Sequence, residues 1–551
     1  MASVRKRRVL AIGLDGYEHS LGERMMTDGE LPALAALKKR SARYVLEHGG
    51  AQRTGLAGEH FSTGLSPADA SKWAAVCFDP ETYATWQEGT SLVPFPAHLQ
   101  AKTVVFDMTY FDLARAPDVG GVVGWGAHDA GVCAAAQPHG LLQEFLTRFG
   151  PYPANQWIYA IAWPSPEHCR QAGEGLAAAA RLRSDAARWL FGERLPDWDL
   201  GLLFVSEPHS AVEALWHGVD PSHPLHKAAS GPAAGDALKR VYRAVDELCG
   251  DMVDAFGDAT VLVFSMAGMG PNRSDIQSMA LLPELLYRDA FGSELLKIPA
   301  DWSAAPRGLP LIPDGKEWVK LVAGAVGESL GRRAARELGR KTAAVMRRLG
   351  MGESGPARFS LDWMPAARYQ PHWRKMRAFA LPSFYDGRIR INLTGRESRG
   401  LVAAGEYRAE LDRLESLLRE CTDISTGEPV VDRIERSEER DPRTLNGTES
   451  DMIIIWRGVS TGFDHPRLGR IGPLPLRRTG GHSRPHGFAY LAGEGIDAMD
   501  CGIASSFDVV PTLIDLVGEP VRTRISGRSL RPVSPAFPRE AQAALKAGRE
   551  R

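Results

Sequence analysis

Short runs of mostly apolar residues recur along this chain and end at glycine, proline or polar positions. They cover residues 9–14, 102–106, 157–161, 200–205, 260–264 and 452–455, and most contain β-branched residues. Segments with helical periodicity lie between them, at 31–40, 176–190 and 234–256. Continuous apolar runs that alternate with helical patterns are typical of a mostly parallel sheet covered by helices on both faces. The sequence therefore predicts a doubly wound α/β fold.

The pattern changes between residues 283 and 375, where a long helical stretch at 316–349 carries many arginines and lysines. This stretch is either a basic cap over an anionic substrate or the solvated face of an amphipathic helix. Core-like patterns return after residue 376, with a charged helix at 406–419 and a capped helix at 506–516. We therefore expect a first core segment at 1–282, a helical basic insertion at 283–375, a second core segment at 376–535 and a charged tail at 536–551.

Composition, net charge and cysteine spacing indicate which broad class of protein this chain belongs to. The 551 residues are 44% apolar and 24% charged, which is ordinary for a globular protein. The formal net charge of −1 gives no global reason to bind nucleic acid or an anionic membrane. Six scattered cysteines without a CxxC pair favour reduced thiols in a cytosol. The first apolar run is too short for a signal peptide, and no run approaches the length of a membrane span, so we expect a cytoplasmic protein without membrane or nucleic-acid partners.

Chemistry-bearing residues lie just past several of the predicted strands. Asp15 follows the run at 9–14, His209 follows the run at 200–205, and Met266 follows the run at 260–264. In parallel sheets ligands bind beyond the carboxyl ends of the strands. We therefore treat these positions as parts of one site.

Several segments, in their order along the chain, resemble the alkaline phosphatase superfamily, and within it the type I phosphodiesterase/nucleotide pyrophosphatase group. They are the opening LDG, the spacing of Thr54 from Thr63, the FSMAGMGP loop, WHGVDPSHP, GRIRINLTGRESRG and the ending DVVPTLIDLVGEPVRTRISGRSL. This resemblance implies an alkaline phosphatase-like α/β core. It also implies two divalent cations, usually zinc, around a nucleophilic threonine or serine.

The resemblance maps onto this sequence incompletely. Asp15, Thr54 and His482 match the family pattern. His209 stands where the family has aspartate, and Glu213 stands where it has histidine. Met266 and Ala267 occupy the positions of an aspartate–histidine pair that binds the first cation.

The exchanged pair can still form a metal site. His209 and Glu213 are four residues apart, so they project from one face if the segment is helical. Together with His482 they supply two imidazoles and one carboxylate, a set that catalytic zinc sites use with an open fourth position. The alternative is a decayed site with an ordinary charged pair, and Glu207 is a second candidate carboxylate.

The other cation site is weaker. A thioether is a soft ligand and a methyl group is none, so Met266 and Ala267 cannot hold a hard divalent cation. Only Asp15 and Thr54 would remain there. The sequence therefore predicts one well-formed cation rather than two.

Roles for the remaining residues follow from the resemblance and from their chemistry. Thr54 would attack phosphorus, and Asp15 would orient or deprotonate it while also contacting the cation. Arg53 and the backbone at Gly55 could hold phosphate oxygens, and Arg484 could bind an anion. Two further groups are weaker candidates: Glu59 with His60 as replacement ligands, and His217, His223 and His226, which we expect to form a structural loop.

These observations give two functional hypotheses of different classes. The first is a metal-dependent phosphodiesterase- or phosphatase-like hydrolase, or a transferase, that acts on a small anionic phosphate or sulfate ester with one zinc ion. The second is a catalytically inactive member of the superfamily that binds a ligand or a partner protein. Metal content would separate them, because a cation raises the melting temperature of a protein that binds it in the folded state.

Overall fold

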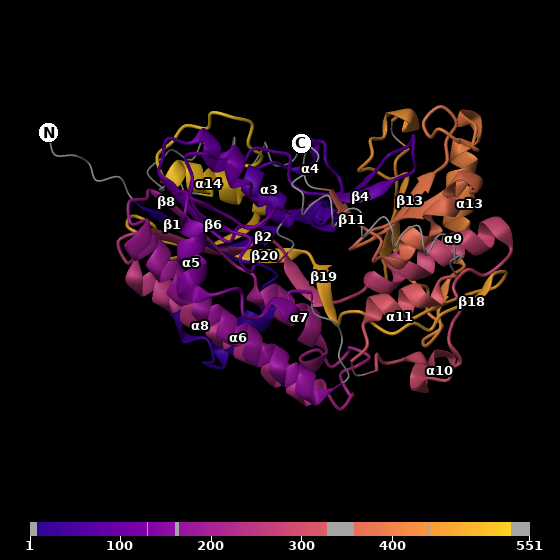
Figure 1. Ribbon diagram of the computed structural model, residues 1–551, viewed down its shortest axis with the longest axis horizontal. Coiled ribbons are helices and arrows are strands. Elements are labelled where there is room, and N and C mark those ends of the chain that lie inside the picture. The colour runs from indigo at the N-terminus through magenta and orange to yellow at the C-terminus, as the bar shows by residue number, and fades with distance from the viewer. Residues whose placement is uncertain are drawn as a thin grey trace.

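The computed structural model describes residues 8–128, 131–159, 165–313, 315–327, 358–438 and 440–530. Figure 1 shows two lobes, one built on a large sheet and the other formed by the later part of the chain. The basic stretch at 328–349 and the expected tail at 536–551 lie outside the described residues. Within the described residues, no helix is long and apolar enough to cross a bilayer.

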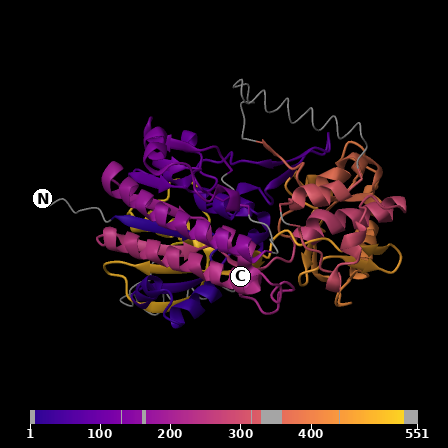
Figure 2. The same cartoon turned by 60° about the horizontal axis from the view of Figure 1, so that its bottom comes forward.

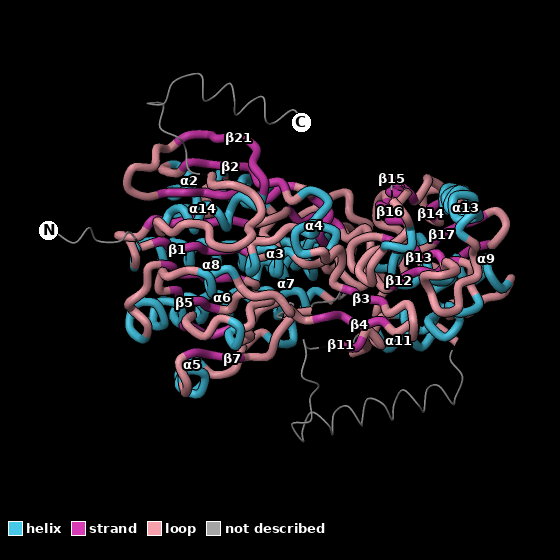
Figure 3. The backbone as a smooth tube through the Cα atoms, turned by 90° about the horizontal axis from the view of Figure 1, so that it is seen from above, coloured by secondary structure: helices cyan, strands magenta, loops and turns pink. Residues whose placement is uncertain are grey.

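A nine-stranded sheet forms the first lobe. In spatial order its strands are β21 (Met499–Ser505), β2 (Ala42–Glu47), β20 (His486–Ala492), β9 (Thr260–Ser265), β1 (Val9–Leu14), β8 (Leu200–Val205), β5 (Thr103–Phe106), β6 (Gly120–Val123) and β7 (Ala135–Gln137). The five strands from β9 to β6 run parallel, whereas β20 and β7 are antiparallel to their inner neighbours. Figure 3 labels β21, β2, β1, β5 and β7 in this order, from one edge of the sheet to the other.

Helices cover both faces of this sheet, so its central strands are buried on both sides. Alternate residues of β1 enter two separate cores: Leu10 and Ile12 pack into one, and Val9 and Ala11 into the other. The first core receives side chains from α1 (His19–Thr27), α2 (Pro32–Lys39), α5 (Leu141–Phe149), α6 (Pro166–Trp189), α7 (Glu207–Leu215) and α8 (Gly231–Ala255). The second receives them from α3 (Ala57–Thr63) and α14 (Val509–Leu516). Figure 2 shows α6 and α8 side by side along the sheet.

The second lobe has its own core around a four-stranded antiparallel sheet. The strands are β12 (Ala378–Leu381), β13 (Gly387–Ile391), β16 (Met452–Trp456) and β15 (Val431–Arg436). Around them lie α9 (Leu282–Phe291), α10 (Ala300–Ser303), α11 (Trp318–Ala325), the 3-10 helix η9 (Pro365–Lys375) and α13 (Tyr407–Arg419). Three small sheets complete the part of the chain that the structure describes: β3 (Val76–Phe78), β4 (Thr85–Glu88) and β11 (Arg358–Ser360); β14 (Thr422–Asp423), β17 (Phe463–His465) and β18 (Gly469–Ile471); and β10 (Gly268–Pro271) with β19 (Gly480–Arg484).

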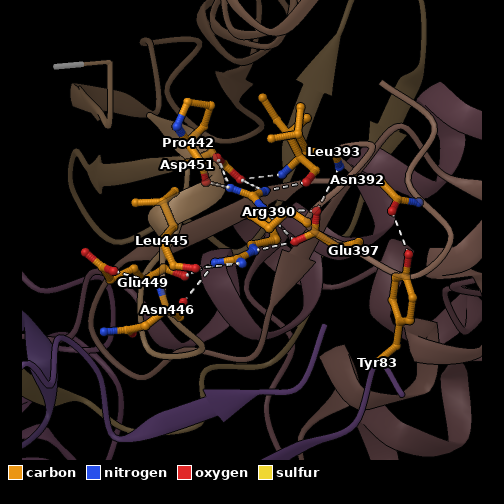
Figure 4. A network of polar contacts seen from close by, with 12 residues as sticks. Tyr83, Arg390, Asn392, Leu393, Glu397, Pro442, Leu445, Asn446, Glu449 and Asp451 are labelled. Atoms are coloured by element: carbon orange, nitrogen blue, oxygen red, sulfur yellow. Dashed lines mark hydrogen bonds and ion pairs between the residues drawn. The ribbon is translucent and has the colours of Figure 1, made fainter. Parts of the chain in front are cut away.

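A buried network of charged side chains holds the second lobe together (Figure 4). Arg390 donates to Glu397 at 2.8 Å and to the backbone oxygens of Leu445, Asn446 and Glu449. Arg396 pairs with Asp451 at 2.7 Å, and all four charged side chains are almost fully buried. The GRIRINLTGRESRG segment therefore has a structural role here, because its arginines hold the loop between β15 and β16 against β13.

The structure confirms the mostly parallel α/β sheet with helices on both faces and corrects three details of the expectation. The run at 157–161 is not a strand in its described part, where Trp157 ends a 3-10 helix. The run at 452–455 is β16, which belongs to the antiparallel sheet of the second lobe. The boundary expected at residue 375 falls inside the second lobe, since one core includes Trp318, Phe379 and Leu474.

Candidate functional site

The carboxyl edge of the parallel strands collects the candidate residues. Asp15 follows β1, His128 follows β6, and His209 is in α7, which follows β8. His482 arrives from β19, which pairs with β10 immediately after β9. Figure 1 places β19 between the two lobes beside α7. Segments that are up to 467 residues apart in the chain therefore meet at one edge of the sheet.

Two glycines allow this close packing. Gly16 has a φ of +60°, and a Cβ there would lie 2.6 Å from His209 Cα. A Cβ on Gly480 would lie 2.2 Å from the carbonyl oxygen of Val212 in α7. Both contacts are with backbone or with the helix that carries the site, so a larger residue would push the loop or β19 away.

Helix α7 presents His209 and Glu213 on one face, and both side chains are buried. Ion pairs fix the start of this helix, because Arg183 donates from Nε to both oxygens of Glu207 at 3.0 Å. Arg183 also donates to Asp107 at 2.7 Å, and Tyr152 donates to Glu207 at 3.0 Å. Both carboxylate oxygens of Glu207 thus accept hydrogen bonds within this buried cluster. Glu213 is therefore the carboxylate that this helix offers to the site.

His209 is the centre of the cluster, with Asp15 on the Nδ1 side of its ring and His482 and Glu213 on the Nε2 side. His209 Nδ1 lies 3.0 Å from Asp15 Oδ2. His209 Nε2 lies 3.1 Å from His482 Nε2 and 3.3 Å from Glu213 Oε1. In a neutral imidazole, a proton on Nδ1 that is donated to Asp15 leaves the Nε2 lone pair directed at His482 and Glu213.

A third imidazole belongs to the same cluster. The rings of His128 and His209 stack with centroids 3.7 Å apart, and His128 Nε2 lies 3.9 Å from Glu213 Oε2. One ligand atom from each of His128, His209 and Glu213 lies within 4.8 Å of the others. His128 does not stand out in the sequence, because the strand before it, β6, begins with two glycines and carries a weak apolar pattern. The signal that could have found it is its position past the end of a strand.

The ligand atoms suit a zinc-like cation. Ligand atoms of a tetrahedral zinc site lie about 3.3 Å apart, since each is about 2.0–2.2 Å from the metal. The separations of 3.1 Å and 3.3 Å around His209 Nε2 agree with this spacing. The three side chains whose ligand atoms all lie within 4.8 Å of one another are His128, His209 and Glu213, a group that does not include His482. Glu213 Oε2 is also buried without a hydrogen-bond partner among the described residues, which is costly for a carboxylate oxygen unless another group satisfies it.

Burial and neighbouring charge keep two of these imidazoles neutral. Desolvation, then His209 and Arg478, hold the pKa of His128 well below its ordinary value. The same causes lower the pKa of His482. Imidazoles must be neutral to bind a metal, so both side chains are ready to act as ligands without first losing a proton.

Arg478 and Arg477 lie beside the cluster, and the carboxylates of Glu213 and Asp275 balance their charges. Arg478 pairs with Glu213 Oε1 through Nη1 and with both oxygens of Asp275. Arg477 donates to Asp275 Oδ2 at 3.0 Å. These two cations and two carboxylates sum to zero formal charge, although burial raises the pKa of Asp275.

Thr54 is near the site, but its hydroxyl is used locally. It ends the 3-10 helix η1 (Gly49–Thr54), donates to the carbonyl oxygen of Ala51 at 2.7 Å and accepts from the Leu56 backbone N–H at 3.2 Å. Gly55, which has a φ of +74°, does line the cavity beside Asp15. In this conformation the structure brings the Gly55 backbone to the cavity, whereas the Thr54 hydroxyl points into its own turn.

The two candidate arginines differ in their position relative to the site. Arg53 pairs with Glu435 of the second lobe at 2.6 Å and lines a polar cavity that it shares with His482. Arg484 donates to Glu18 at 3.0 Å and to Ser20, outside the residues that line the cavity beside Asp15. The substrate-binding role expected of Arg484 therefore requires that it leave Glu18.

Met266 and Ala267 lie where the sequence places them, at the end of β9 and in the same cavity as Asp15. The cavity has a volume of about 50 Å³, and its lining near Asp15 also includes Phe204 and Phe264. Apolar walls at this position offer no further ligand for a cation. The donor set thus lies on the His209 side of Asp15.

Glu59 and His60 do not join the metal-type cluster. Glu59 pairs with Lys72 at 2.8 Å, and both are buried. His60 Nδ1 lies 3.1 Å from His48 Nε2, and His48 Nδ1 contacts the Ser506 hydroxyl. His217 and His223 are likewise buried, and His217 contacts Ser230 at 3.1 Å.

The buried His48 predicts a loss of stability in acid. Burial lowers the pKa of His48 to about 4 from its ordinary 6.5. Between these values the unfolded chain binds a proton that the folded protein does not, so the free energy of unfolding falls as the pH drops from 6.5 towards 4. At pH 5 this one group accounts for about 2 kcal/mol.

Urea denaturation at pH 7 and pH 5 measures this effect. We expect the His48→Gln variant to lose about 2 kcal/mol less than the wild type between the two pH values, because Gln does not titrate. A variant with the same pH dependence as the wild type would show that His48 is not the group responsible.

Comparisons with known proteins find distant similarity only. No protein-family model matches the chain, and no curated protein matches its sequence. The phosphonoacetate hydrolase of Sinorhizobium meliloti 1021, solved with phosphonoformate, is similar at a TM-score of 0.49 and 14% identity, over 93% of this chain and 96% of that one. Human ectonucleotide pyrophosphatase/phosphodiesterase 5 is similar at a TM-score of 0.43 and 12% identity, over 95% of this chain and 97% of that one. The murine protein of the same name, solved with AMP, gives a TM-score of 0.42 and 12% identity over the same shares.

Proposed function

We propose that this protein is a hydrolase of phosphate or sulfate esters that works with a single divalent cation, most suitably zinc. The observation that carries the proposal is the spacing of His209 Nε2 from His482 Nε2 and from Glu213, at 3.1 Å and 3.3 Å. Imidazoles with one carboxylate are the ligand set of catalytic zinc sites. The sequence resemblance to type I phosphodiesterases and nucleotide pyrophosphatases supports the same class of reaction.

Each residue of the site would have a separate role. His209, His482 and Glu213 would hold the cation, with His128 as an additional imidazole. Such a cation would polarise the ester oxygens and acidify a hydroxyl group. Asp15 fixes the ring of His209 by accepting from Nδ1, as carboxylates do beside metal-binding histidines. Arg478 balances the charge of Glu213, so the site carries less negative charge towards an anionic ester.

Thr54 is the proposed nucleophile. Its hydroxyl would leave the carbonyl oxygen of Ala51 by rotating about χ1 and would then form a bond to phosphorus. Asp15, which keeps a second carboxylate oxygen, would accept the hydroxyl proton while the P–O bond to the leaving alkoxide breaks, and this alkoxide would take a proton from water. The resulting hydroxide would attack phosphorus of the phosphothreonine, and the Thr54 oxygen would leave with the proton returned by Asp15, with the backbone at Gly55 contacting the phosphate oxygens.

Hydrolysis of bis(4-nitrophenyl) phosphate with added Zn²⁺ or Mn²⁺ tests this assignment. We expect Thr54→Ala to lower kcat/KM by at least about a hundredfold, because it removes the attacking group, and Thr54→Ser to retain most of the activity. Thr63→Ala is a matched control, since the Thr63 hydroxyl donates to the Glu59 carbonyl oxygen within α3. Equal rates for wild type and Thr54→Ala would remove Thr54 from the mechanism.

A catalytically inactive binding module is the second candidate. The apolar residues Met266 and Ala267 and the local hydrogen bonds of Thr54 favour it. Under this alternative the protein binds an anionic ligand or a partner and turns over no ester. Purified protein without bound metal, with no gain in melting temperature on adding Zn²⁺ and no hydrolysis of several phosphate and sulfate esters, would support it over the enzyme.

A further inference from the structure

A second cavity opens beside the cluster of imidazoles. It has a volume of about 460 Å³, and it shares His128 and Tyr385 with the narrow cavity at Asp15. The narrow cavity is much smaller, at about 50 Å³. A substrate whose anionic group lies at His209 would therefore find more space for its remainder in the neighbouring cavity.

The walls of the larger cavity are mainly aromatic. Phe359 from β11, Trp363 and Phe384 come from the second lobe, and Tyr159 comes from the first. Phe359 and Tyr159 are 39% and 55% exposed, which is unusual for large apolar side chains inside a cavity. Such surfaces gain free energy when a ligand covers them, and aromatic side chains prefer stacked or edge-on contacts with another ring.

The polar groups of this cavity carry no net charge. Arg477 and Arg478 line it, but Asp275 and Glu213 balance their charges. The Arg477 guanidinium also lies over the Trp363 ring at 4.9 Å from the centroid. A few polar groups among aromatic walls, at this volume, are typical of sites for small organic molecules, which span about 300–1,000 Å³.

The cavity on the other side of His482 has a different character. It has a volume of about 410 Å³ and is lined by Arg53, Arg273, Arg433 and Glu47 together with Tyr385, Trp456, glycines and Ser483. Arg53 and Arg433 both pair with Glu435. This cavity therefore has more charged side chains in its walls than the aromatic cavity has.

We propose that the aromatic cavity binds the organic group of the substrate, and that this group is an uncharged aromatic ring attached to the anionic head. The inference rests on the proposed function in one respect, since it places the anionic head at His209 and His482. It adds the class of substrate: an ester with an aryl group rather than a small alkyl group.

Isothermal titration with phenylphosphonate and methylphosphonate in the presence of Zn²⁺ tests the inference, because the two ligands share the anionic head. We expect phenylphosphonate to bind at least about tenfold more tightly, since its ring buries apolar surface that a methyl group cannot. Phe359→Ala and Trp363→Ala should each reduce this ratio, and their double variant should bring it close to one. Leu401→Ala is a matched control, because Leu401 is 45% exposed elsewhere on the second lobe.

The outcomes separate this inference from the proposed function. Ester hydrolysis by a protein that binds both phosphonates equally would overturn the aryl subsite and leave the enzyme standing. A tenfold preference that the double variant abolishes, without hydrolysis of any ester, would support the subsite on an inactive scaffold. A preference that survives the double variant would place the ring elsewhere and would also contradict the inference.

Discussion

His209→Ala is expected to lose the bound cation and to lower kcat/KM for phosphodiester hydrolysis by at least about a thousandfold, because a metal contributes several kcal/mol of charge stabilisation in the transition state. This side chain contacts every other member of the cluster: Asp15 at 3.0 Å, His482 at 3.1 Å, Glu213 at 3.3 Å and the stacked ring of His128. Metal content by elemental analysis and steady-state kinetics measure the two effects on one preparation.

His226→Gln is the matched control for this variant. His226 lies beyond α7 and donates from Nδ1 to the His217 carbonyl oxygen at 2.8 Å, outside the cluster. We expect it to keep its metal and its activity. A His209→Ala protein that retains both one equivalent of metal and wild-type kcat/KM would show that the cluster is not the metal site.

The second large effect concerns stability. Arg183→Met should lower the free energy of unfolding by about 3–5 kcal/mol, because it leaves buried carboxylates without their cation. Arg183 and both of its partners, Asp107 and Glu207, are 0% exposed. Since Glu207 begins the helix that carries His209 and Glu213, the variant should also bind metal more weakly. Urea denaturation and a zinc titration provide the two measurements.

Arg181→Met provides the comparison on the same helix. Arg181 is 53% exposed and pairs with Glu247 at the surface, where an ion pair contributes under about 1 kcal/mol. Similar losses for the two variants would mean that the buried cluster does not hold α7 in place.

The parallel strands of the sheet could be predicted from the sequence because they are buried on both faces. The runs at 9–14 and 200–205 coincide with β1 and β8, and the helical pattern at 31–40 coincides with α2 within a residue at each end. β6 was missed, since two of its four residues are glycine, and His128 was missed with it. Candidate residues do lie past the carboxyl ends of the parallel strands, but the sequence reveals only those strands that have a strong apolar pattern.

The second lobe was harder to predict, for a different reason. Its strands are antiparallel, and β16 alternates between buried and partly buried positions. A short run of this kind does not reveal which sheet it joins, so 452–455 was placed with the parallel strands. The grouping of Trp318 with Phe379 depends on packing between segments far apart in the chain, which local patterns do not contain.

The orientation of the side chains could not be predicted from the sequence. The chain order brought Asp15, His209, Glu213 and His482 together at one edge, as the resemblance implied. The same resemblance could not show that Arg484 pairs with Glu18 or that the Thr54 hydroxyl closes its own turn. These contacts depend on rotamers and on neighbours that no motif specifies.

Anomalous diffraction at the zinc absorption edge, from crystals of the full chain grown with Zn²⁺, is the most direct test of the proposed cation site. We predict one strong peak in contact with His209 Nε2, His482 Nε2 and Glu213, and none beside Met266 and Ala267. Crystals in which the three side chains surround no anomalous peak, while Arg478 keeps its ion pair to Glu213, would contradict a metal-dependent function for this site.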